Sequence, residues 1–267
     1  MEGSFGARRG GGLADGPAPS RERRRGPARR EVHIDSLTDG YRAGDRAIVC
    51  VDVLLSSTTV ATSLAQGRRT VLTATVEEAR ARGRGLAYPL VVSEPGSPGA
   101  DGPDIHTGPL ALEYLQGRPQ DVVVVSPAAK ILYDTSAAVY VACLRNMSAT
   151  ARLLARRHDL VTLVAAGHAG ELRSEDQMVA AWIAAKLVDA GFQPSGLHTA
   201  REVERWSRAD LSLAALGRGA EHLRRIGRAE ELEYVLSRID DLDFACRFHA
   251  GEIIGVRVSP VRSATSH

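Results

Sequence analysis

One stretch constrains the fold more than any other, an apolar run that ends in an acidic residue and a group of hydroxyl side chains. Ala47 to Val53 contains six apolar residues, interrupted only by Asp52. A half-exposed strand would alternate polar and apolar residues, so this run predicts a parallel strand covered on both faces. Because a lone buried carboxylate is strongly destabilised, Asp52 needs a cation, a metal ion or convergent hydrogen-bond donors as its partner.

Hydroxyl residues follow that strand from Ser56 to Thr59, and a helical pattern then runs from Val60 to Gln66 and ends at Gly67. Hydroxyls and free backbone N–H groups at the start of a helix, just past a strand, suit a phosphate, sulfonate or carboxylate. The alternative is structural: one of the serines only caps the helix, and Asp52 only bonds the neighbouring backbone. The stretch taken alone leaves both interpretations open.

Composition bounds the class of protein. With 267 residues and 44% hydrophobic side chains, the chain is long enough to bury a full core. The net charge is +2, and much of the arginine excess lies in the first thirty residues, which argues against a nucleic-acid surface. No apolar run approaches the ~20 residues that cross a bilayer, so we expect no membrane partner and a cytoplasmic location.

Three widely spaced cysteines, Cys50, Cys143 and Cys246, are typical of reduced core residues rather than of disulfides or a zinc site.

The domain organisation follows from where large apolar residues occur. Residues 1–30 are dominated by Gly, Pro and Arg, so we expect a disordered tail that supplies nothing to a core. Residues 31–267 are interpreted as a single α/β domain. The pattern becomes more helical beyond Gly191, which leaves a subdivision near residue 191 open.

Strand and helix patterns alternate along this domain, which predicts an α/β fold with a mostly parallel sheet and flanking helices. The expected strands are 32–34, 46–53, 70–73, 90–92, 121–125, 139–143, 160–165 and 252–258. The expected helices are 60–66, 76–84, one that ends at 155, 178–190, 200–206, 211–226 and 229–236. Ser174 and Gln177 have the spacing of a capping box, which predicts the start of the 178–190 helix.

The segment from Ser93 to Pro109 is rich in Gly and Pro and is too long for an ordinary connection, so it is interpreted as a binding loop. Its chemically active residues are Glu94, Asp101, Asp104 and His106. Glu94 follows the 90–92 strand and is therefore expected at the same carboxyl edge of the sheet as Asp52.

Eight short motifs occur in an order and spacing similar to those of the 2-phosphosulfolactate phosphatase family. They lie at residues 52–59, 74–80, 93–94, 102–109, 125–127, 143–149, 165–167 and 175–176, and the resemblance covers roughly residues 32 to 256. The resemblance implies an Mg²⁺-dependent phosphatase with an α/β fold that acts on a small phosphorylated metabolite. The resemblance does not decide whether the protein forms a homo-oligomer.

The resemblance also implies roles for individual residues. The expected metal ligands are Asp52, Glu94 and Glu175, and Asp52, Asp104 and Asp176 form the catalytic set, with Asp104 or Asp176 as general base. The expected substrate-binding residues are Ser57, Thr58, His106, Lys130, Arg145 and Asn146. The structural alternative for Glu175 and Asp176 is that they only complement the dipole of the helix they begin.

The chain departs from the family pattern at its cations. Leu55 stands where the family usually has an arginine, and Pro95 stands in place of another. His106, Thr107 and Gly108 replace a Gly-Asn-Ser sequence, and Ala128, Ala129 and Lys130 replace Asn-Gly and a hydroxyl. These changes predict a less anionic substrate than phosphosulfolactate. The competing hypothesis is a non-catalytic relative that binds a metabolite or a protein partner.

Overall fold

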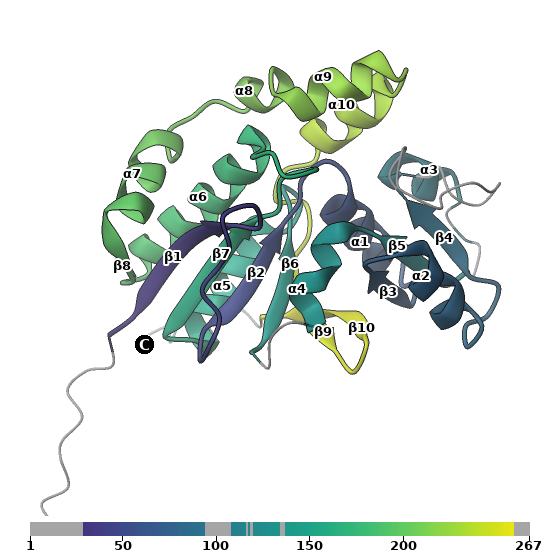
Figure 1. The fold of residues 1–267 in the computed structure, drawn as a ribbon, viewed down its shortest axis with the longest axis horizontal. Coiled ribbons are helices and arrows are strands. Elements are labelled where there is room, and N and C mark those ends of the chain that lie inside the picture. The colour runs from purple at the N-terminus through teal and green to yellow at the C-terminus, as the bar shows by residue number, and fades with distance from the viewer. Residues whose placement is uncertain (1–28, 94–107, 116, 118–119, 134–136, 259–267) are drawn as a thin grey trace, which may run out of the picture.

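A computed structural model describes residues 29–93, 108–115, 117, 120–133 and 137–258 (Figure 1). Within them the strands form one sheet, in the order β4-β5-β3-β10-β9-β6-β2-β7-β1-β8. Their bounds are β1 Glu31–Ser36, β2 Ala47–Val51, β3 Thr70–Thr73, β4 Leu90–Ser93, β5 Val122–Val125, β6 Val139–Ala142, β7 Leu160–Ala165, β8 Gln193–Pro194, β9 Phe244–His249 and β10 Glu252–Arg257.

The sheet consists of two parallel halves joined by an antiparallel hairpin. Strands β4, β5 and β3 are parallel to one another, as are β6, β2, β7, β1 and β8. The hairpin of β9 and β10 lies between the halves, with β10 antiparallel to β3 and β9 antiparallel to β6. The mostly parallel α/β sheet expected from the sequence is therefore confirmed, whereas β9 was not anticipated.

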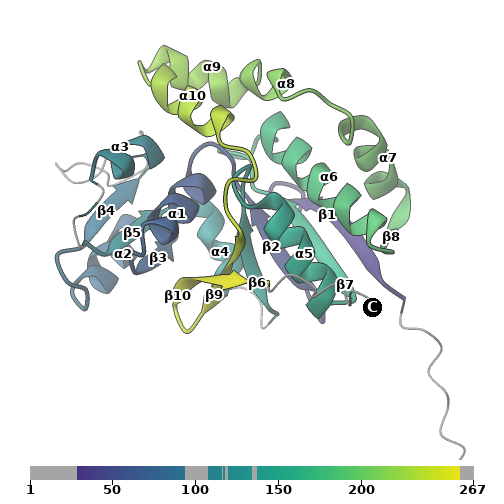
Figure 2. The ribbon, with the colours of Figure 1, turned by 180° about the vertical axis from the view of Figure 1, so that it is seen from behind.

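Helices cover the sheet on both sides (Figures 1 and 2). Their bounds are α1 Ser56–Ala65, α2 Val76–Gly83, α3 Pro109–Tyr114, α4 Lys130–Tyr133, α5 Met147–Arg157, α6 Ser174–Asp189, α7 Gly196–Trp206, α8 Ser212–Ala215, α9 Arg218–Arg225 and α10 Ala229–Ser237, with a 3₁₀ turn at Pro127–Ala129. One core packs α5, α6 and α10 against β1, β2 and β7, and a second packs α1, α3 and α4 against β3, β5 and β6. None of the described helices is long and apolar enough to span a bilayer.

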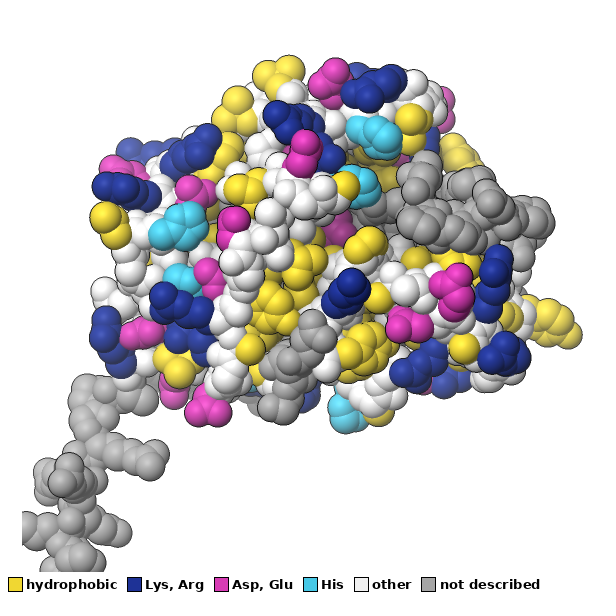
Figure 3. Space-filling view, in the orientation of Figure 1, with side chains coloured by type: hydrophobic (Ala, Val, Ile, Leu, Met, Phe, Trp, Pro, Cys, Tyr) yellow, Lys and Arg dark blue, Asp and Glu magenta, His cyan; other side chains and the backbone are white. Residues whose placement is uncertain are grey.

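The surface seen in Figure 3 mixes charges of both signs. Basic and acidic side chains are interspersed around an apolar area near the middle of this face. This distribution fits the near-neutral net charge of the sequence.

Two helix predictions are wrong, both near the carboxyl edge of the sheet. Helix α6 begins at Ser174, with Arg173 at the N-cap position and no side-chain capping bond, so Ser174 and Gln177 form no capping box. The 211–226 helix is broken into α8 and α9 by a segment at Leu216 and Gly217. In both places a carboxylate of α6 makes tertiary contacts that override the local pattern, as described below.

The described residues begin at Arg29, close to the predicted tail boundary. Arg30, which composition assigned to the tail, donates Nη1 to the carbonyl of Ala190 at 2.9 Å and Nη2 to that of Ala155. Its guanidinium also lies 4.1 Å from the centre of the Phe192 ring. Residues 1–28 lie outside the described residues.

The cysteines provide a test of the core. Cys50, Cys143 and Cys246 are free and buried, and burial raises the pKa of Cys143 to about 11. Because only an accessible thiolate reacts, we expect no labelling of the native protein by a disulfide reagent at about pH 8, and labelling of all three thiols after unfolding in guanidinium. Rapid labelling of any cysteine in the native protein would contradict this packing.

Candidate active site

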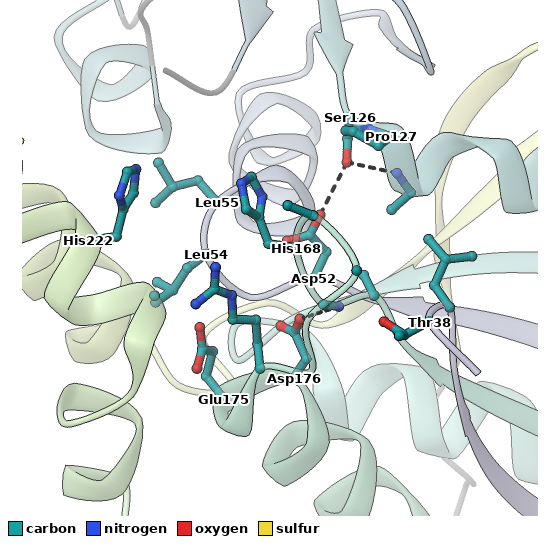
Figure 4. A pocket seen from close by; sticks show the side chains of 18 of the residues that line it. Thr38, Asp52, Leu54, Leu55, Ser126, Pro127, His168, Glu175, Asp176 and His222 are labelled. Carbon is teal, nitrogen blue, oxygen red and sulfur yellow. Dashed lines mark hydrogen bonds between the residues drawn. The ribbon is translucent and has the colours of Figure 1, made fainter. Parts of the chain in front are cut away.

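A pocket of about 250 Å³ lies at the carboxyl edge of the sheet (Figure 4). Its walls are segments that directly follow β1, β2, β5 and β7, together with the start of α6 and one side of α9. The lining residues are Leu37, Thr38, Asp52, Leu54, Leu55, Ser126, Pro127, Ala128, Ala166, Gly167, His168, Ala169, Gly170, Arg173, Glu175, Asp176, Gly219, His222 and Leu223. Ligand sites of parallel α/β sheets commonly lie at this edge, so the pocket is the candidate active site.

Asp52 connects the two halves of the sheet at this pocket. Its side chain is buried one residue past the end of β2, as the apolar run predicted. The hydroxyl of Ser126, which follows β5 in the other half of the sheet, donates to Asp52 Oδ2 at 3.2 Å (Figure 4). The carboxylate thus accepts a hydrogen bond from the other half of the sheet and lines the pocket.

Asp176 is buried beside Asp52. Its two oxygens accept the backbone N–H groups of Val53 at 2.8 Å and Gly167 at 3.0 Å, which fixes the start of α6 to the ends of β2 and β7. Burial raises the pKa of Asp176 well above its usual range, and the nearby Asp52 and Glu175 raise it further. Three carboxylates, those of Asp52, Glu175 and Asp176, therefore lie in one pocket.

Glu175 is the third acid of the pocket, and it lies against a glycine backbone. A Cβ at Gly219 would overlap Glu175 Oε1, and a Cβ at Gly217 would lie 2.8 Å from Oε2. The break between α8 and α9 is thus the place where the chain passes over this carboxylate. Burial raises the pKa of Glu175, and the guanidinium of Arg173 acts in the opposite direction.

Three residues predicted to bind the substrate do not line the pocket, namely Ser57, Thr58 and Lys130. Ser57 Oγ accepts the backbone N–H of Asp52 at 3.2 Å, and Thr58 Oγ1 donates to the carbonyl of Val53 at 2.9 Å. Lys130 is exposed on α4. A direct contact of Ser57 or Thr58 with a substrate would require these internal bonds to be replaced, so such contacts stay predictions.

Arg145 and Asn146 are buried away from the pocket lining. Arg145 donates to both oxygens of Asp241, at 3.0 and 2.7 Å, and its Nη1 donates to Thr62 and Tyr234. Asn146 accepts the backbone N–H of Cys143 at 2.9 Å. In this arrangement both side chains hold the segment after β6 against its neighbours. The remaining predicted site residues, Glu94, Asp104 and His106, lie outside the described residues, as does Pro95.

A family model described as 2-phosphosulpholactate phosphatase matches residues 32–250. The chain belongs to the 2-phosphosulpholactate phosphatase family. The resemblance inferred from the motifs is therefore confirmed.

A relative from Pseudothermotoga lettingae is 30% identical over 190 residues, which cover 70% of this chain and 82% of the relative. Another from a Synechococcus strain is 28% identical over 214 residues, which cover 78% of this chain and 84% of the relative. Both relatives are named probable 2-phosphosulfolactate phosphatase.

Membership of this phosphatase family raises the question of whether the pocket suits a divalent cation. Among the described residues, no three His, Cys, Asp or Glu side chains form a group that would hold a metal by themselves. Mg²⁺ usually keeps several waters and binds proteins through one or two carboxylates, and the pocket offers the carboxylates of Asp52, Glu175 and Asp176, whose burial and mutual repulsion raise the pKa of Asp176. The residues present therefore fit Mg²⁺ better than a metal that demands a full protein cage.

Three ionisable residues of the pocket were not predicted from the sequence. Arg173, His168 and His222 all line the pocket, from the start of α6, the segment after β7 and α9 respectively. Arg173 adjoins the Glu175-Asp176 motif, and that proximity was the only local signal for it. His222 has no such signal, because only tertiary packing brings α9 over the sheet edge.

The contact between Glu175 and the glycine backbone is testable. Replacing a helical glycine by alanine usually stabilises a protein by up to about 1 kcal/mol. At Gly219 the added methyl group displaces the Glu175 carboxylate, so we expect Gly219→Ala to destabilise the protein by about 1–3 kcal/mol in urea unfolding. Gly85→Ala, in the turn after α2, is the control, since the atom nearest to its added Cβ would be 3.7 Å away. An unchanged or higher stability of Gly219→Ala would contradict the contact.

Proposed function

We propose that the protein is an Mg²⁺-dependent phosphatase that hydrolyses a small phosphate monoester in the pocket at the carboxyl edge of the sheet. The observation that carries the proposal is the convergence of Asp52, Glu175 and Asp176 in one small cavity of a member of a phosphatase family. The volume of about 250 Å³ suits a small metabolite rather than a polymer. We place this activity in the cytoplasm, as for an enzyme of small-molecule metabolism.

In this proposal the acids of the pocket have different roles. Asp52 and Glu175, with Glu94 from outside the described residues, hold Mg²⁺ through hard carboxylate oxygens. When bound, Mg²⁺ supplies positive charge that neutralises the phosphate oxygens. Asp176 is held by two backbone N–H groups, and its raised pKa makes it a better proton acceptor than an ordinary carboxylate. We therefore assign Asp176, or Asp104, to take the proton from the attacking water.

The alternative function is a relative that binds a metabolite or a partner without turnover. Leu55 favours it, since this apolar side chain lines the pocket where the family usually has an arginine. The acids argue for catalysis, because gathering three carboxylates in a buried pocket is costly and gives a simple binding protein no advantage. We therefore favour the phosphatase.

Substitution of Asp52 tests the catalytic assignment. Asp52→Asn keeps the shape of the side chain but removes its charge, so we expect Mg²⁺-dependent phosphate release to fall at least about a hundredfold while circular dichroism is unchanged. Asp45→Asn, at an exposed position before β2, is the control and should retain activity. Full activity of Asp52→Asn would remove this residue from the catalytic set.

Metal binding is measurable without turnover. A ligand that binds only the native state stabilises it, and at about 100 times its Kd the gain corresponds to a rise of about 5–10 °C in the melting temperature. We expect Mg²⁺ to produce such a rise in protein treated with a chelator, and Asp52→Asn to lose most of it. A potassium salt at equal ionic strength controls for screening. The absence of a rise with Mg²⁺ would contradict a metal site at these acids.

A further inference from the structure

A second cavity, a groove of about 480 Å³, lies between the end of α7 and α8. Both helices pack against α6, and Figure 1 shows them on its outer side. Trp206 forms a buried wall of the groove, whereas Leu213 and Leu216 line it with 43% and 77% of their surfaces exposed. The groove is thus lined by apolar side chains that are open to solvent, and it is large enough for a small organic molecule.

The aromatic wall of the groove is held rigidly. The indole N–H of Trp206 donates to Glu202 Oε2 at 3.0 Å, and the carbonyl of Trp206 accepts the indole N–H of Trp182 at 2.9 Å. Because Trp182 belongs to α6, these bonds fix the last turn of α7 to that helix. A ligand would therefore meet a preformed surface and would not have to order it on binding.

Two arginines add positive charge to this apolar surface. Arg205 and Arg208 line the groove, and the guanidinium of Arg205 lies 4.5 Å from the centre of the Trp206 ring. In the described part of the chain neither arginine has an ion pair with a carboxylate. Asp210, the acid closest to Arg208 in sequence, accepts a backbone N–H at the start of α8 at 2.8 Å. No acidic side chain of the described residues lines the groove, so its charge is positive only.

The groove is separate from the candidate active site. Ser174 and Gly217 line the groove, whereas Glu175 and Gly219 line the active-site pocket. A Cβ at Gly217 would lie 2.8 Å from both Ser174 Oγ and Glu175 Oε2, so these two segments pack closely against each other. The two cavities share no described lining residue and are separated by this wall.

We propose that the groove is a second ligand site, which binds a small amphipathic anion with an aromatic or branched apolar body and one sulfonate, carboxylate or phosphate group. The apolar body packs against Trp206, Leu213 and Leu216, and the anionic group binds Arg205 and Arg208. Charge complementarity decides the class of ligand, since the groove offers two cations and no acid among the described residues. The inference goes beyond the proposed phosphatase function and does not depend on it.

The test uses two fluorescent probes that share one aromatic body. The first, 8-anilinonaphthalene-1-sulfonate, carries a sulfonate, and the second, N-phenyl-1-naphthylamine, is neutral. We expect saturable binding of the sulfonate probe to the native wild-type protein, at one molecule per chain. Arg208→Gln should raise the Kd of the sulfonate probe about three- to tenfold and that of the neutral probe less than about twofold, because only the former has an anionic group. Leu213→Ser should raise both Kd values.

Two control variants locate the probe. Arg201→Gln, at an exposed position of α7 that does not line the groove, should leave both Kd values unchanged. Arg173→Gln, in the active-site pocket, should do the same. Weaker binding in Arg173→Gln instead of Arg208→Gln would place the probe in the active-site pocket and overturn the proposal. Equal Kd values in the wild type and Arg208→Gln would show adventitious binding to apolar surface only, which also overturns it.

A second copy of the chain is the competing occupant of the groove. Sedimentation velocity measures this without any probe. We expect the sedimentation coefficient of the wild type to be unchanged by Leu216→Ser and by a saturating concentration of the sulfonate probe. A wild-type dimer that either treatment dissociates would assign the groove to self-association and overturn the ligand site.

Discussion

The structure depends on the way in which one buried carboxylate closes the carboxyl edge of the sheet. Asp176 accepts backbone N–H groups from the segments after β2 and β7, so a single side chain fixes the start of α6 to two strands. These bonds satisfy donors that would otherwise be buried without partners. The same carboxylate lies beside Asp52 and Glu175, and the resulting charge repulsion is the feature that makes the pocket suited to a cation.

A second polar network holds the helices that surround this edge. Arg145, after β6, binds Asp241, Thr62 of α1 and Tyr234 of α10, and Tyr234 in turn donates to Glu113 of α3 at 2.6 Å. Glu231 of α10 accepts the backbone N–H of Leu110 at 3.0 Å. Such a buried network is costly unless nearly all of its members are satisfied, and its main effect is to specify one arrangement of these helices. The family motif around Arg145 thus has a structural explanation in this chain.

The pocket combines apolar walls with charges of both signs, which is a suitable environment for phosphate chemistry. Leu37, Leu54, Leu55 and Leu223 limit the water around the acids, and lower local polarity strengthens the effect of each charge. Asp52 follows β2, whereas Glu175 and Asp176 lie in the first turn of α6 beside Arg173, and the two histidines come from the segment after β7 and from α9.

The sequence by itself determined most of the strands, the parallel character of the sheet and the acids at its edge. Apolar runs such as Val122–Val125 are local signals, and Asp52 stands out because it interrupts one of them. It did not determine β9, whose run is broken by Arg247 and His249, or the break between α8 and α9. Tertiary structure alone decided that Ser126 bonds Asp52, 74 residues away, and that Val53 bonds Asp176, 123 residues away. It also turned Arg145 toward Asp241 and brought His222 to the pocket.

The physical reason is a difference in range. The alternation of apolar and polar residues that predicts a strand or helix depends on a few neighbouring positions, whereas the partner of a polar side chain is set by packing between distant segments.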